Sequence, residues 1–275
     1  MRKTALVTGA NRGIGLATVK KLKSMGYKVY MGVRSQEKAN EALNKIGNPT
    51  DVIPLVMGLE NEEQIAEAYK KYLSLKDEDE SLDILINNAV TALDWIPDVS
   101  HISTLDIEYS AMEKMYRVNV LAPLFMMRYF LPSMKKGSRI VNVASGSGEF
   151  WDPNALKDFQ PGYATTKSAL IMLTKKMAAS VINKEIFVNS CCPGWCKTET
   201  GGWHADTTPE DGADSVIATL FLNLEKPPFG HHYRYGNRIM LDVYPEFLRK
   251  NRQISLKNII QKTIIIIKLK LTEYM

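Results

Sequence analysis

A tyrosine and a lysine four residues apart, Tyr163 and Lys167, are the strongest chemical signal in the sequence. On a helix this spacing places both side chains on one face, about one turn apart. A free tyrosine has a pKa near ~10, too high for efficient proton transfer at neutral pH. A nearby ammonium group favours the phenolate and lowers that pKa. The pair therefore predicts acid–base chemistry, although Tyr-x-x-x-Lys alone also occurs in purely structural helices.

A glycine-rich turn, residues 8–15, follows the apolar run 4–7 and opens a helix-like segment. Gly9 permits a tight turn, Gly13 lets the backbone approach a pyrophosphate, and Gly15 allows close packing of helix on strand. The helix N-terminus offers free N–H groups and the positive end of the helix dipole to phosphates. The turn predicts a dinucleotide site; the alternative is a βα turn without a ligand.

Two arginines predict which dinucleotide is bound. The second strand-like run, 28–33, is followed by Arg34, and no acid stands where NAD-selecting folds place one. The planar guanidinium of Arg34 suits a 2′-phosphate, and Arg12 in the glycine turn adds a second positive charge. With no acid to oppose them, the pair favours NADPH. The alternative for each arginine is a solvated surface position.

Alternating strand-like and helix-like segments must position these residues. Such alternation with short connections predicts a parallel sheet covered by helices on both faces, and continuous apolar strands fit a sheet buried on both sides. The prediction is a single-domain α/β Rossmann-type doubly wound fold. Residues 1–250 form the dinucleotide-binding and catalytic domain, and 251–275 form a basic C-terminal tail of unknown role. Expected strands are 4–7, 28–33, 51–57, 82–86, 139–143, 186–189 and 238–241; expected helices are one ending at residue 24, 35–46, 62–73, two within 110–134, 163–181 and 209–222.

The order of the motifs resembles the short-chain dehydrogenase/reductase family over roughly residues 3 to 245. The motifs are Thr-Gly-x-x-x-Gly-x-Gly at 8–15, Asn87-Asn88-Ala89, Asn119, Ser145, Tyr163 with Lys167, and Pro193-Gly194 with Thr198. Within the family, residues 191–195 and 11–15 are most similar to the carbonyl reductase branch.

The resemblance implies a role for each motif. Tyr163 gives its proton to the substrate oxygen, Ser145 hydrogen-bonds that oxygen, and Lys167 holds the nicotinamide ribose. Asn119 supports a proton relay through water and the lysine, and the cofactor supplies the hydride. Ser147 is a weaker alternative to Ser145. The implied catalytic residues are Asn119, Ser145, Tyr163 and Lys167; the implied cofactor-binding residues are Thr8, Gly9, Asn11, Arg12, Gly13, Ile14, Gly15, Arg34, Asn88, Ala89, Tyr163, Lys167, Pro193, Gly194 and Thr198.

The substrate end and two departures from the family pattern complete the expected site. Ser145, Tyr163, Trp151 and Trp195 are the expected substrate-binding residues. The loop 149–162 is rich in aromatic residues, which form either an apolar wall for a carbonyl substrate or simple loop packing. The segment 201–208 is a candidate opposite wall or lid. Val90 stands where the family has glycine; Gly58 stands where it has an adenine-contacting aspartate, for which Glu60 is a substitute.

Composition excludes several other classes. Hydrophobic residues make up 45% of the 275 residues, as in a globular protein. The net charge of +5 is a mild excess, much of it in the tail, and need not mean nucleic-acid binding. Three clustered cysteines argue against a disulfide framework and a zinc site, so no metal is expected. With neither a signal peptide nor an apolar run of roughly 20 residues, we expect a cytoplasmic protein without a membrane span.

The function predicted from the sequence is NADPH-dependent reduction of an aldehyde, ketone or quinone. The partner is a small-molecule carbonyl compound, and the protein is a monomer or small homo-oligomer. The main alternative is a catalytically weak NADP(H)-binding regulatory protein on the same fold. Two further readings are partner or RNA binding through the basic tail, and an alcohol dehydrogenase working oxidatively, against which Arg34 counts. The particular substrate stays open because loops form the pocket walls.

Overall fold

The computed structural model describes residues 2–96, 100–150, 157–222 and 228–239. The chain divides into two units, residues 1–239 and 240–275. The second unit, which includes the tail 251–275, lies wholly outside the described residues. The division into a domain 1–250 and a separate tail therefore stays a prediction.

The first unit is built on an eight-stranded sheet in which all neighbours are parallel except the last pair. The strand order reverses beside β1, because β2 and β3 extend the sheet on one side and β4, β7 and β8 on the other. This arrangement confirms the predicted Rossmann-type doubly wound fold. The order is β10 (Asn237–Ile239), β9 (His232–Arg234), β8 (Phe187–Cys192), β7 (Met134–Val143), β4 (Leu82–Asn87), β1 (Thr4–Thr8), β2 (Lys28–Val33) and β3 (Val52–Val56).

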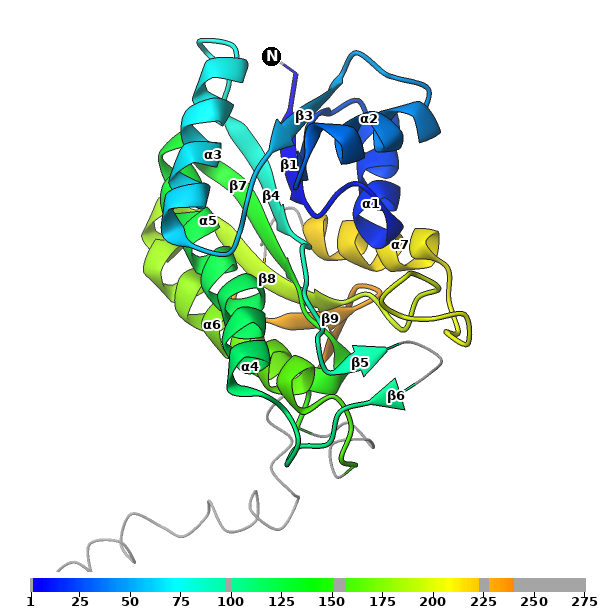
Figure 1. Cartoon of the computed structure of the whole chain (residues 1–275). Helices are drawn as coiled ribbons and strands as arrows, with labels where there is room; N and C mark the ends of the chain where they lie inside the picture. The colour runs from blue at the N-terminus through cyan, green and yellow to red at the C-terminus, as the bar shows by residue number, and fades with distance from the viewer. Residues whose placement is uncertain (1, 97–99, 151–156, 223–227, 240–275) are drawn as a thin grey trace, which may run out of the picture. The chain divides into compact units, whose positions relative to one another are not determined.

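Helices cover both faces of the sheet (Figure 1). Successive residues of β1 face opposite sides, so Ala5 and Val7 pack in one core and Leu6 in the other. The first core lies under α1 (Gly13–Ser24), α2 (Gln36–Lys45) and α7 (Pro209–Leu220); the second lies under α3 (Glu62–Leu75), α5 (Ala122–Phe130) and α6 (Pro161–Val181).

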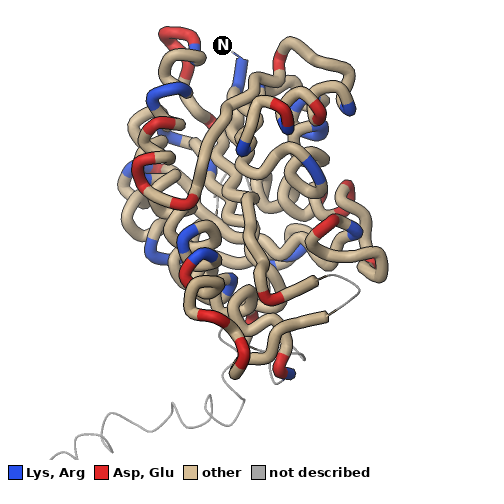
Figure 2. The backbone as a smooth tube through the Cα atoms, viewed as in Figure 1, with Lys and Arg blue, Asp and Glu red and all other residues tan. Residues whose placement is uncertain are grey.

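Charged residues follow the helices and loops, while the middle of the sheet is almost free of them (Figure 2). β1 and β8 carry no charged residue at all. This distribution is the one expected for strands buried on both faces. No helix in the described part of the chain is long and apolar enough to cross a bilayer.

Local signals explain where several helices begin or end. Ser35 caps α2 by accepting a hydrogen bond from the Lys38 amide at 3.3 Å, as its sequence position predicted. Thr208 and Asp211 form a reciprocal capping box ahead of α7. Gly26, with φ of +87°, follows α1 in the conformation expected of a residue just past a helix end.

Short or irregular elements differ from the sequence expectation. The hairpin β5 (Trp95–Ile96) and β6 (Ser100–His101) and the strand β9 were not predicted, because two or three residues carry no periodicity. The 110–134 region forms α4 (Tyr109–Tyr116), a π-helical turn at Arg117–Leu121 and α5. β7 begins at Met134, earlier than expected, because Met134 pairs with Leu82 beyond a register shift.

Replacing Phe130 tests the second core. Its fully buried ring lies 5.1 Å from the Tyr69 ring and 5.3 Å from that of Tyr72, between centroids. Phe130→Ala is expected to lower the free energy of unfolding by about 3 to 5 kcal/mol because it leaves a cavity. Urea unfolding followed by circular dichroism measures the loss. Leu105→Ala, at a side chain that is 93% exposed, is the control and changes stability by less than about 0.5 kcal/mol.

Candidate active site

One large cavity of about 990 Å³ opens at the carboxyl ends of the parallel strands. This is the edge at which doubly wound sheets bind ligands. Thr8 and Asn119 do not line the cavity, and Trp151 lies outside the described residues. The predicted site residues that do line it are Gly9, Asn11, Arg12, Gly13, Ile14, Gly15, Arg34, Asn88, Ala89, Ser145, Tyr163, Lys167, Pro193, Gly194, Trp195 and Thr198.

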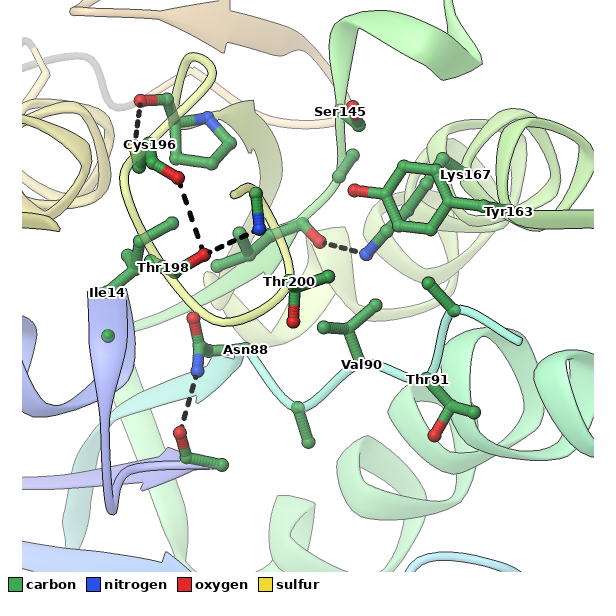
Figure 3. A pocket seen from close by; sticks show the side chains of 18 of the residues that line it. Ile14, Asn88, Val90, Thr91, Ser145, Tyr163, Lys167, Cys196, Thr198 and Thr200 are labelled. Atoms are coloured by element: carbon green, nitrogen blue, oxygen red, sulfur yellow. Dashed lines mark hydrogen bonds between the residues drawn. The ribbon is translucent and has the colours of Figure 1, made fainter. Parts of the chain in front are cut away.

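Ser145, Tyr163 and Lys167 meet on one wall of the cavity (Figure 3). Ser145 follows the end of β7, whereas the other two side chains project from the first turns of α6. Tyr163 shares a side-chain hydrogen bond with Ser145. The Lys167 ammonium lies 5.5 Å from the Tyr163 ring centroid and donates a 2.8 Å hydrogen bond to the carbonyl oxygen of Val143.

Burial dominates the electrostatics of this group. It raises the pKa of Tyr163 to about 12, partly offset by the hydrogen bond with Ser145. It lowers the pKa of Lys167 to about 8. The sequence-based expectation that the ammonium group leaves the tyrosine pKa below its ordinary value is therefore wrong, because desolvation is the largest contribution to that pKa and raises it.

Asn119 does not line the cavity, but its hydrogen bonds join two of the segments that do. It lies in the π-helical turn, where its amide nitrogen donates to the Thr91 carbonyl at 2.8 Å and to the Thr166 hydroxyl at 3.0 Å. Its amide oxygen accepts from the Thr91 backbone nitrogen at 2.8 Å. These bonds fasten the loop after β4 to α6. The implied part of Asn119 in a proton relay stays a prediction.

The glycine turn is also braced by its neighbours. Thr8 is buried, and its hydroxyl accepts from the backbone nitrogens of Asn88 and Ala89, both at 3.0 Å. The Asn88 side chain donates to the carbonyls of Thr8 and Gly9. A Cβ on Gly15 would clash with the Gly9 carbonyl, which is the close packing predicted for this glycine. Thr8 thus shapes the turn without lining the cavity.

The start of α1 fits a phosphate-bearing cofactor. Arg12 occupies the N-cap without a side-chain cap, and the first turn contains no acidic residue. The amides of this turn therefore face the cavity without a competing carboxylate in the helix itself. Gly9 and Gly13 adopt φ values of +62° and +52°, which favour glycine.

The two arginines differ in their surroundings. Glu199, from the loop after β8, forms an ion pair with Arg12, so the expectation that no acid opposes the pair is wrong. Burial and the nearby Arg34 lower the pKa of Arg12. Arg34 is exposed at the cavity edge and forms neither a hydrogen bond nor an ion pair within the described ranges. Because Arg12 and Glu199 lie far apart in the chain, their pairing could not be predicted from the sequence.

The substrate end contains aromatic residues that the sequence did not single out. Trp95 and His101, both on the β5–β6 hairpin, pack edge-on against Phe159 with centroids 5.0 and 5.3 Å apart. In the sequence, the feature that could have pointed to them is Phe159, which belongs to the loop 149–162 considered as an aromatic wall. Phe150 from that loop is 78% exposed and does not line the cavity. Pro153, like Trp151, falls outside the described ranges.

Two indole groups tie down the loop after β8. Trp195 is about half exposed and donates to the Gly201 carbonyl at 2.7 Å. Trp95, from the hairpin, donates to the Thr200 carbonyl at 2.9 Å, and both residues line the cavity. The opposite wall expected near Trp195 thus contacts the hairpin directly.

The two departures from the family pattern are accommodated locally. Val90 lines the cavity. A Cβ on Gly58 would clash with the Gln64 side chain, so no larger residue fits there without a shift. Glu60 lines the cavity and pairs with Lys114 at 3.1 Å, and its part in adenine binding stays a prediction. All three cysteines are free thiols, and the described residues contain no cluster of metal-binding side chains.

A family model described as short chain dehydrogenase matches residues 3–207 of this chain. The protein belongs to the short-chain dehydrogenase/reductase family. The short-chain dehydrogenase anuI of Penicillium roqueforti is 33% identical over 239 residues, which cover 82% of this chain and 91% of the relative. The 3-oxoacyl-[acyl-carrier-protein] reductase FabG of Aquifex aeolicus is 32% identical over 72% of this chain and 75% of its own.

Solved structures agree with this assignment. The NADPH-bound carbonyl reductase from chicken fatty liver has a TM-score of 0.76 at 25% identity, covering 87% of this chain and 99% of that one. The Sniffer carbonyl reductase of D. melanogaster, at 22% identity, shares the fold with a TM-score of 0.74 over 86% of this chain and 98% of its own. The resemblance inferred from the motifs is confirmed: the protein is an oxidoreductase of a family that binds nicotinamide cofactors.

The pKa of Lys167 predicts a pH-dependent contribution to stability. Its folded value is about 8 against 10.5 when unperturbed, so between these values the unfolded chain holds a proton that the folded chain has released. Stability therefore rises with pH across this window. We expect the unfolding free energy of the wild type, relative to Lys167→Met, to increase from about pH 8 to about pH 10. Urea unfolding at each pH measures it, and a flat difference would contradict the buried-lysine account.

Proposed function

We propose that the protein is an NADPH-dependent reductase that transfers hydride to the carbonyl carbon of an aldehyde, ketone or quinone. The observation that supports this is the meeting of Ser145, Tyr163 and Lys167 on one wall of the cavity that also contains the glycine turn. A candidate proton donor, a hydroxyl and an ammonium group thus line the same cavity as the start of α1, which we propose as the phosphate site.

Each side chain has a distinct part in the proposed reaction. Ser145 donates a hydrogen bond to the carbonyl oxygen and stabilises the negative charge that develops on it. Tyr163 then gives its phenolic proton to that oxygen, which completes the alcohol. Lys167 holds the ribose hydroxyls and places its positive charge under the tyrosine ring, where it opposes the effect of burial. A bound nicotinamide would supply the hydride.

Arg34 supports the choice of NADPH. Because it has no partner among the residues described, its guanidinium is available for a 2′-phosphate at the end of β2. Arg12 adds positive charge there, although Glu199 neutralises part of it. The chicken carbonyl reductase of similar structure holds NADPH.

The lining of the substrate end favours a carbonyl compound with an apolar body. Trp95, Phe159 and Trp195 present ring surfaces there, and we include Trp151 as a proposed further contact. Flat apolar groups gain free energy by stacking against such rings. Quinones and aromatic aldehydes or ketones are therefore the first compounds to test.

Replacing Tyr163 with phenylalanine tests the proton donor. The change removes the phenolic proton and leaves the ring, so we expect kcat to fall at least about a hundredfold while NADPH binding is kept. NADPH oxidation is followed by near-ultraviolet absorbance with a panel of quinones, aldehydes and ketones, with NADH in parallel. Tyr109→Phe, at an exposed tyrosine, is the matched control. Turnover equal to the wild type in Tyr163→Phe would refute the assignment.

The same panel of carbonyl compounds distinguishes the proposed reductase from the main alternative. Wild-type protein that binds NADPH but reduces none of the carbonyl compounds would be a catalytically weak NADP(H)-binding regulator.

Arg34→Ala tests the cofactor preference. Loss of a charge-assisted hydrogen bond to the 2′-phosphate is expected to raise the KM for NADPH about tenfold or more and to leave the KM for NADH unchanged. Steady-state kinetics with both cofactors measure the ratio. Arg117→Ala, which removes an exposed arginine paired with Glu113, is the control. Equal changes for the two cofactors would show that Arg34 does not read the phosphate.

A further inference from the structure

Asp94 is a buried carboxylate directly behind the proposed proton donor. The residue is completely buried where the loop after β4 enters the β5–β6 hairpin. One carboxylate oxygen accepts a 2.9 Å hydrogen bond from the backbone nitrogen of Tyr163. The other oxygen is buried and has no hydrogen-bond partner among the described residues. A partly unpaired buried carboxylate is costly, and the positive end of the α6 dipole offsets part of that cost.

The hydrogen bond between Asp94 and Tyr163 is one of the links between the loop after β4 and α6. Asn119 links Thr91 to Thr166, and Asp94 reaches Tyr163 three residues earlier in the helix. The backbone carbonyl of Asp94 also accepts from the Ile102 nitrogen at 3.0 Å. Asp94 therefore joins the first turn of α6 to the hairpin that carries Trp95.

The charge of Asp94 acts on the same phenol. The groups that face Tyr163 are the Ser145 hydroxyl, the thiols of Cys192 and Cys196, the Lys167 ammonium and the Asp94 carboxylate. After burial, which is the largest cause, Asp94 and the two thiols raise the pKa of Tyr163, while the hydrogen bond with Ser145 lowers it. A fixed negative charge disfavours a second one on the phenol.

We propose that Asp94 is a positioning residue for the carbonyl reduction: its carboxylate fixes the backbone of Tyr163 and keeps a negative charge behind the phenol. The hydrogen bond holds the first turn of α6 in place, and the charge makes the phenolate of Tyr163 less favourable than it would be without Asp94. This inference rests on the proposed function, and it gives a positioning role to a residue that does not line the cavity.

Two substitutions separate the hydrogen bond from the charge. Asp94→Asn keeps an oxygen that accepts from the Tyr163 nitrogen and removes the charge. Asp94→Ala removes both. Asp83→Asn is the matched control, because Asp83 also accepts from a backbone nitrogen, that of Thr4 at 2.8 Å, but lies at the start of β4, at the opposite edge of the sheet.

The pH profile of carbonyl reduction is the first readout. In Asp94→Asn we expect the alkaline limb of kcat to move to lower pH by roughly 1 unit, with kcat at neutral pH kept. In Asp94→Ala we expect kcat to fall at least about tenfold with the KM for NADPH unchanged, because the phenol is misplaced. Asp83→Asn leaves the profile as in the wild type. An unmoved limb in Asp94→Asn together with full activity in Asp94→Ala would overturn the proposal.

A titration of Tyr163 that does not depend on catalysis tests the role of Asp94 separately from the proposed function. The tyrosines are labelled with ¹³C at the ring carbon bearing the hydroxyl, and Tyr163 is assigned by its loss in Tyr163→Phe. The onset of ionisation should come at lower pH in Asp94→Asn than in the wild type. Should Asp94→Asn not fold, Asp94→Ser, which also keeps an oxygen acceptor without charge, replaces it.

The outcomes are distinguishable. A shifted titration in a protein that reduces no carbonyl compound refutes the proposed function and leaves the action of Asp94 on Tyr163 in place. Carbonyl reduction with an unshifted titration and an unshifted pH profile refutes the proposed role of Asp94 and leaves the function in place.

Discussion

The parallel alignment of β1, β4, β7 and β8 is the constraint on which the candidate site depends. Because the four strands run in one direction, their carboxyl ends lie along one edge of the sheet. The glycine turn, the loop after β4, Ser145 and the loop that begins at Pro193 all leave the sheet there. Segments more than a hundred residues apart thus surround a single cavity, and α6 adds Tyr163 and Lys167 from one face of the sheet.

Desolvation decides the state of the central pair. The pKa of Tyr163 is raised and that of Lys167 is lowered, because the same buried surroundings disfavour the charged form of each side chain. The bond from Lys167 to the Val143 carbonyl fixes the ammonium at the end of β7, beside the loop that carries Ser145. Burial thus keeps Tyr163 in its protonated form, the form from which the proposed transfer of a proton to a substrate oxygen starts.

Residues that do not touch the cavity set much of its geometry. Thr8 braces the glycine turn against the loop after β4, and Asn119 and Asp94 fasten that loop to α6. The hairpin is tied at its base by Asp94 and at Trp95 by the bond to Thr200. The walls are therefore linked to one another by hydrogen bonds through the loop after β4 and the hairpin.

Local and periodic signals let the sequence alone predict the fold class, the cap at Ser35, the glycine turn and the placement of Tyr163 and Lys167 on one helix face. These features depend on residues close together in the chain or on the repeat of a helix or strand. Tertiary structure alone decided that Glu199 pairs with Arg12, that Asn119 turns toward Thr91 and Thr166, and that Trp95 enters the cavity wall. It also decided that burial raises the pKa of Tyr163. Such contacts join distant segments, and desolvation depends on everything that surrounds a group, so no local pattern encodes either.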